Sequence, residues 1–72
     1  MNGEQTFELV IEKLKQEHYP HRVETSLDGF EISHAPSGRT TIDHEGQITV
    51  VTSCHTELRF SSYAEWLYWF DI

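Results

Sequence analysis

Four residues with metal-binding side chains occur in two pairs, His18 with His21 and Cys54 with His55. Three imidazole groups and one thiolate are a donor set that can hold Zn²⁺ tetrahedrally. The spacing of the two pairs does not match that of known zinc-binding motifs, and a histidine near the end of a helix is equally explained by the helix dipole. We therefore expect no metal and no other cofactor, and keep a zinc-binding protein that uses these four residues as an alternative.

Cys54 is the only cysteine, and with His55 or His44 and the acid Asp43 it could form a nucleophilic site. The residues around it do not match the flanks of a thiol protease or of a disulfide oxidoreductase. Asp43 and Glu45, which flank His44, are explained by the chemistry of a polar turn. A domain of this size also has little room for a catalytic pocket, which typically needs about 300 Å³ or more. We expect that the protein is not an enzyme.

The composition is that of one small globular domain, 1–72, with 38% hydrophobic and 24% charged residues. The formal net charge of −7 argues against nucleic-acid binding, because that function requires a cationic surface. No apolar stretch approaches the ~20 residues of a membrane span, and a single cysteine fits a reducing compartment. We therefore expect a cytoplasmic protein that binds neither nucleic acid nor membrane.

The acidic residues suggest a second alternative function. If the glutamates in the first half of the chain shared one surface, they could imitate the phosphates of DNA, and the protein would inhibit a DNA-binding protein. A solvated acidic face explains the same residues without any partner. The glutamates of this acidic nucleic-acid mimic would be Glu4, Glu8, Glu12, Glu17, Glu24 and Glu31.

The elements that would position these side chains begin with a helix over residues 4–17. The helix is expected to end at Tyr19, because a residue that precedes proline is forced out of the α region. Four of its apolar residues, Phe7, Val10, Ile11 and Leu14, follow the i, i+3, i+4, i+7 spacing of one helical face.

Asp28 and Gly29 lie between two alternating runs and predict a two-residue hairpin turn, since both central positions of that turn need a positive φ. The flanking strands then place their apolar residues on one side of the sheet. The pairs on this side are Leu27 opposite Phe30, Thr25 opposite Ile32, and Val23 opposite His34.

Three further strands are predicted over 39–43, 47–52 and 57–60, where Val51 interrupts the alternation as a bulge or as an outward apolar residue. Ser62 and Glu65 match a capping box that begins a final helix. The order α-β-β-β-β-(β)-α predicts a two-layer α+β fold, with four to five antiparallel strands and both helices on one face. The expected core consists of Phe7, Val10, Ile11, Leu14, Val23, Leu27, Phe30, Ile32, Ile42, Ile48, Val50, Leu58, Phe60, Trp66, Leu67 and Phe70.

The final helix holds more large apolar residues than a core contact needs. One face about 100° wide is the width expected for such a contact, and it holds Tyr63, Trp66, Leu67 and Phe70. The residues left over either cover the rim of the sheet and a frayed end, or bind a protein partner that could be a second copy. We expect a small accessory module, of the kind found in bacteria and phages, that binds a protein through Tyr68, Trp69 and Ile72.

Overall fold

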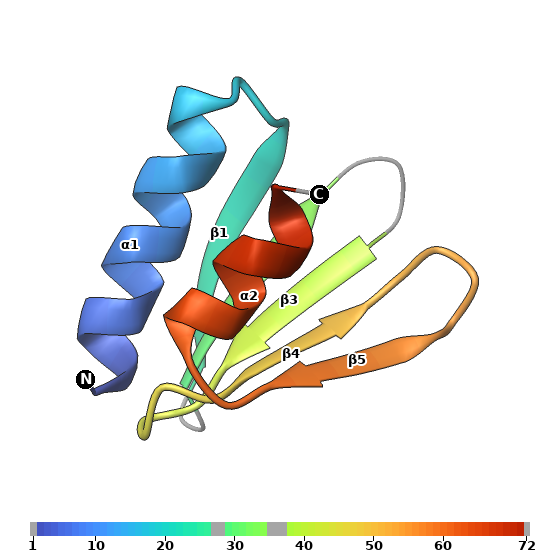
Figure 1. Cartoon of the computed structure of the whole chain (residues 1–72). Coiled ribbons are helices and arrows are strands. Elements are labelled where there is room, and N and C mark those ends of the chain that lie inside the picture. Colours follow the sequence, from blue (N-terminus) through green and yellow to red (C-terminus); the bar gives the residue numbers. More distant parts are fainter. Residues whose placement is uncertain (1, 27–28, 35–37, 72) are drawn as a thin grey trace.

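The computed structural model describes residues 2–26, 29–34 and 38–71 of the chain. Within these residues the chain forms an N-terminal helix, five strands and a C-terminal helix (Figure 1). Their bounds are Gly3–Gln16 for α1, His21–Ser26 for β1, Gly29–His34 for β2, Gly38–Ile42 for β3, Ile48–Val51 for β4, Glu57–Phe60 for β5 and Tyr63–Phe70 for α2. This order confirms the predicted α+β fold, with the fifth strand present.

The five strands form one antiparallel sheet in the order β1-β2-β3-β4-β5, so each strand pairs with its neighbours in the sequence. Residues directly opposite each other share a face of the sheet, and the faces alternate along each strand. One row of the apolar face consists of Val23, Ile32, Thr40, Val50 and Leu58. Val51 lies on the other face, where it pairs in regular register with Arg39 and Glu57, so it is an outward apolar residue.

The first hairpin differs in register from the prediction. Ser26 pairs with Gly29 and Val23 pairs with Ile32, so the predicted pairing of Val23 with His34 is wrong by two residues. A shift of two residues keeps every side chain on the same face, because the faces alternate with a period of two. The predicted faces are therefore right although the predicted partners are not.

Gly29 is the first residue of β2 and has a φ of 142°. A Cβ at this position would overlap the carbonyl oxygen of Ile42 on β3, so the glycine permits close contact between two backbones. Gly29 thus belongs to the paired strand, whereas the prediction placed it at the centre of the turn. The other predicted turn residue, Asp28, and its neighbour Leu27 lie outside the described residues.

Both ends of α1 are capped. The side-chain oxygen of Asn2 accepts from the N–H of Gln5 (2.9 Å), and the side-chain oxygen of Gln5 accepts from the N–H of Asn2 (3.1 Å), which is a capping box. At the other end the N–H of Tyr19 donates to the carbonyl of Leu14 (2.9 Å), and His18 has a φ of 53°. This is a Schellman motif with histidine at the left-handed position that glycine usually takes.

Both helices lie on the apolar face of the sheet, α1 mainly over β2 and β3 and α2 over β5 (Figure 1). Val23, on the edge strand β1, is 43% exposed because α1 does not extend over it, so its predicted place in the core is wrong. Thr6 and Thr40 are buried without having been predicted. The fully buried apolar residues form one cluster of Val10, Leu14, Ile32, Ile42, Ile48, Val50 and Trp66.

α2 begins after Ser62, as predicted. The hydroxyl of Ser62 accepts from the N–H of Glu65 (3.3 Å), whereas the Glu65 carboxylate turns back to Ser61, whose N–H (3.2 Å) and hydroxyl both donate to it. Trp66 points into the core and stacks on Phe70, with ring centroids 4.9 Å apart. Neither helix in the described part of the chain has the length and apolar character needed to cross a lipid bilayer.

Gly3 joins the start of α1 to the turn between β3 and β4. Its N–H donates to the carbonyl of His44 (2.8 Å). A Cβ at this position would overlap the carbonyl oxygen of Asp43 and crowd the Cα of His44. The first turn of α1 therefore packs directly on the backbone of the turn, which leaves no room for a side chain.

We expect Gly3→Ala to lower the free energy of unfolding by about 1–3 kcal/mol, because the added methyl group must push the turn away. The direction of this change in stability is informative, since alanine in place of glycine normally stabilises a helix by about 1 kcal/mol. Denaturant unfolding of the wild type and the variant measures the change, with the exposed Glu4→Ala as control. A Gly3→Ala variant more stable than the wild type would contradict the close backbone contact.

Candidate functional site

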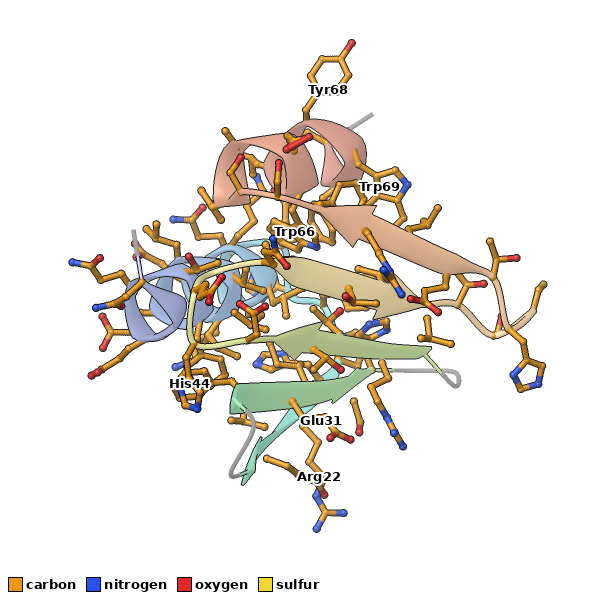
Figure 2. All side chains as sticks on the ribbon, turned by 90° about the horizontal axis from the view of Figure 1, so that it is seen from below. Arg22, Glu31, His44, Trp66, Tyr68 and Trp69 are labelled. Carbon is orange, nitrogen blue, oxygen red and sulfur yellow. The ribbon has the colours of Figure 1, made fainter. Side chains whose placement is uncertain are left out.

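Tyr68 and Trp69 form an exposed aromatic surface on α2. Tyr68 is 75% exposed and Trp69 is 39% exposed, whereas Trp66 on the same helix is 2% exposed. Figure 2 shows Tyr68 pointing away from the body of the protein and Trp66 pointing toward the sheet. Trp69 packs on Phe60 of β5, with ring centroids 5.5 Å apart, so one part of its ring covers the rim of the sheet and another part faces solvent. The third predicted residue, Ile72, lies outside the described residues.

Two shallow hollows border the aromatic surface. The hollow of about 430 Å³ is lined by Ala64, Leu67, Tyr68 and Asp71. The hollow of about 610 Å³ is lined by Arg59, Phe60, Ala64, Glu65, Tyr68 and Trp69. Because both hollows include Tyr68 and the small residue Ala64, the Tyr68 ring stands as a ridge between them. Apolar groups of a second molecule could fit on either side of this ridge.

Two charged groups beside the aromatic surface, Asp71 and Arg59, are paired with opposite charges within the chain, whereas the Glu65 carboxylate accepts from Ser61. Asp71 accepts from the Lys13 ammonium group of α1 (3.1 Å), which also donates to Glu17 (2.9 Å). The hydrogen bond to Glu17, followed by the one to Asp71, raises the pKa of Lys13 above its ordinary value. Arg59 donates to Glu57 on the same strand (2.7 Å). The chemistry that this surface offers to a partner is therefore mainly apolar contact.

The four predicted zinc ligands are not assembled. His18 is exposed in the left-handed turn after α1, and His21 begins β1 with its Nδ1 donating to the carbonyl of Tyr19 (2.8 Å). Cys54 and His55 are exposed in the turn between β4 and β5. Among the described residues, no three histidine, cysteine, aspartate or glutamate side chains are grouped so that they could hold a metal ion. The zinc alternative receives no support from this arrangement.

The candidate nucleophile Cys54 and its candidate partners Asp43 and His44 lie at opposite ends of β4, whereas the other candidate, His55, follows Cys54 in the same turn. Cys54 follows this strand, whereas Asp43 and His44 precede it in the turn from β3. The Asp43 carboxylate accepts from the N–H groups of Glu45 and Gln47, both at 2.9 Å. These bonds confirm the interpretation of Asp43 as a turn residue, and β4 separates the Asp43 carboxylate from the turn that holds the cysteine.

The glutamates of the nucleic-acid mimic alternative do not share one surface. Those of α1 lie on the helical side of the molecule, whereas Glu24 and Glu31 lie on the opposite face of the sheet. Glu31 accepts from Arg39 (3.0 Å), and Glu17 accepts from Lys13 (2.9 Å). A mimic of nucleic acid needs a continuous line of free negative charge, which these residues do not form together.

A hollow of about 700 Å³ near the ends of β1 to β4 was not predicted. The described residues that line it include three histidines and two arginines, namely His21, His34, His55, Arg22 and Arg39. The feature from which this hollow could have been predicted is the pairing of His21 with His34 across β1 and β2. The predicted register placed Val23 opposite His34, and this error concealed the histidine pair.

His34 is the half-buried member of this group. The absence of a side chain at Gly38, directly opposite on β3, leaves space for the imidazole ring, which hydrogen-bonds with the hydroxyl of Thr40 (3.0 Å). Tyr19 packs edge-on against the ring at 5.8 Å. Burial lowers the pKa of His34 below its ordinary value near 6.5, and the charge of the neighbouring His21 acts in the same direction.

We expect folding stability to fall as the pH falls below about 6.5, because the unfolded chain then binds a proton at residue 34 more readily than the folded chain does. Thermal unfolding between about pH 7.5 and pH 5.5, a window above the carboxylate range, measures this loss. His34→Gln should reduce it, whereas His18→Gln, at an exposed position, should retain it. A His34→Gln variant with the full pH dependence of the wild type would show that this histidine is not its source.

Comparisons with known proteins assign no relative to this chain. No protein-family model matches it, and no curated sequence or solved structure matches it significantly. A functional assignment therefore depends on the residues described above.

Proposed function

We propose that this protein is a non-enzymatic protein-binding module that contacts its partner through Tyr68 and Trp69 of α2. The observation that supports this proposal is the exposure of Tyr68 beside a partly exposed tryptophan, on a helix whose opposite side is buried in the core. Large aromatic side chains are enriched at the centres of protein interfaces and contribute most of the binding energy there.

The fold itself gives no reason for an aromatic residue at position 68. With three quarters of its surface in solvent, the Tyr68 side chain adds little to the core, and a polar residue would suit an exposed helical position better. Trp69 is different, because it contacts Phe60 and so also serves the fold. Tyr68 is therefore the residue for which binding is the better explanation.

The shape of the surface favours a partner with protruding apolar side chains. Tyr68 and Ala64 line the hollows on both sides of the ridge, so two such side chains could enclose the tyrosine ring. Burial of one aromatic ring typically removes 150–250 Å² from water, at about 25 cal/mol per Å² of apolar area. Because Asp71 and Arg59 are paired within the chain and Glu65 is the one unpaired charge among the described residues that line the two hollows, binding should depend only weakly on salt.

Partner capture with the purified protein tests the proposal. We expect Tyr68→Ala and Trp69→Ala each to weaken binding of the captured protein by about tenfold or more, since residues of this type often contribute 2 kcal/mol or more. Val23→Ala is the matched control, because it removes an exposed apolar side chain from β1, at the opposite edge of the sheet from β5 and α2. Thermal unfolding of all three variants separates lost binding from lost folding.

Two results would contradict the proposal. Equal recovery of the same protein by the wild type and by both α2 variants would show that the partner binds elsewhere. Binding that disappears steeply with added salt and is insensitive to Tyr68→Ala would instead favour recognition of the acidic face of α1 by a basic protein.

A further inference from the structure

β1 forms one edge of the sheet, and its apolar side is uncovered. Val23 is 43% exposed although its partner on β2, Ile32, is fully buried. Between α1 and β1 lies a hollow of about 440 Å³, lined by Phe7, Glu8, Ile11, Glu12, Lys15 and Val23. The apolar layer of the molecule therefore stops one strand short of the sheet edge.

The backbone of β1 is equally available. In an antiparallel sheet, alternate residues of an edge strand direct their N–H and C=O groups away from the neighbouring strand, where another strand can pair with them. Proteins usually protect such edges with charged side chains, with proline, with a bulge or with a covering segment. The described β1 strand, His21–Ser26, contains no proline and pairs with β2 in unbroken register.

The sequence of β1 is complementary to itself about Val23. We propose that two copies of this chain pair through their β1 strands, antiparallel and with Val23 opposite Val23, so that the two sheets join into one. On the outer face this register places Arg22 of one copy opposite Glu24 of the other, twice about the two-fold axis. On the inner face it brings the two exposed Val23 side chains together, beside the hollows under α1.

Charge selects this register over its neighbours. The two helical layers stay on the same side of the joined sheet only if inward-facing residues of one copy lie opposite inward-facing residues of the other. The two residue numbers of every opposed pair must then add to the same even number, so neighbouring allowed registers differ by two in this sum. Shifting the pairing one step in either direction centres it on residue 22 or on residue 24. The first places Arg22 opposite Arg22 and the second places Glu24 opposite Glu24, and like charges directly opposite each other are destabilising.

Both charges lack an oppositely charged partner in the described part of their own chain. Arg22 makes no ion pair there, and Figure 2 shows it at the end of the molecule far from α2. Glu24 is opposite Glu31, whose carboxylate is already bonded to Arg39 at 3.0 Å. Arg22 of a second copy would thus supply Glu24 with a cationic partner, which the described residues of its own chain do not provide.

The proposed pairing is independent of the proposed function, because α2 packs over β5 at the other edge of the sheet. Sedimentation velocity and light scattering on the purified full chain, from about 10 µM to 1 mM, should show a monomer–dimer equilibrium, as expected for a small interface of modest affinity. Arg22→Glu and Glu24→Arg should each weaken dimerisation by about tenfold or more, because each creates two repulsive contacts. Val23→Lys, which opposes two ammonium groups on the axis, should abolish it.

The double variant Arg22→Glu with Glu24→Arg is the decisive control, since it reverses both ion pairs and should restore dimerisation to near the wild-type level. Trp69→Ala should leave dimerisation unchanged, and thermal unfolding verifies that each variant is folded. A wild-type chain that stays monomeric at every concentration would overturn the proposal. So would a double variant no better than the single ones, or a dimer that Trp69→Ala dissociates.

Discussion

The helices of this chain supply enough apolar side chains to cover only part of one face of its sheet. α1 covers β2 and β3, and α2, with eight residues, covers β5. The opposite face is polar apart from Val51, and neither helix covers Val23 on the edge strand β1. Val23 is therefore exposed beside a fully buried Ile32, although both residues are apolar and share the same face. The core of a domain this small ends where its helices end.

The burial of Trp66 fixes the orientation of α2, and with it the position of the aromatic surface. A helix of eight residues is marginal by itself, so its stability must come from packing. Trp66 supplies that packing because it is 2% exposed and stacks on Phe70, while Lys13 holds the far end of the helix through Asp71. Any rotation of α2 that buried Tyr68 would expose Trp66. Such a rotation would lose far more apolar contact at Trp66 than it would gain at Tyr68. The exposure of Tyr68 follows from this fixed orientation.

Features that repeat within one element could be predicted from the sequence, whereas features that depend on two elements could not. The face of each strand is fixed by a period of two, so it was predicted correctly even where the hairpin register was wrong by two residues. The role of Gly29 depends on the backbone of Ile42, thirteen positions later, and the local pattern resembles that of an ordinary turn glycine. His18 was interpreted as a residue near the end of the helix, but the sequence did not predict that it occupies the left-handed position that glycine usually takes there.

The aromatic surface on α2 could be predicted from the sequence, whereas the uncovered edge at β1 could not. Tyr68 could be identified by helical spacing alone, because the residues around it belong to one short helix. The openness of β1 could not, since the alternation of apolar residues along β1 is the same whether or not a helix covers that strand. The location of the two surfaces at opposite edges of the sheet has a functional consequence. A pair of chains joined at β1 would carry an aromatic surface at each outer end, and a partner with two matching sites would then bind with an avidity that neither surface provides alone.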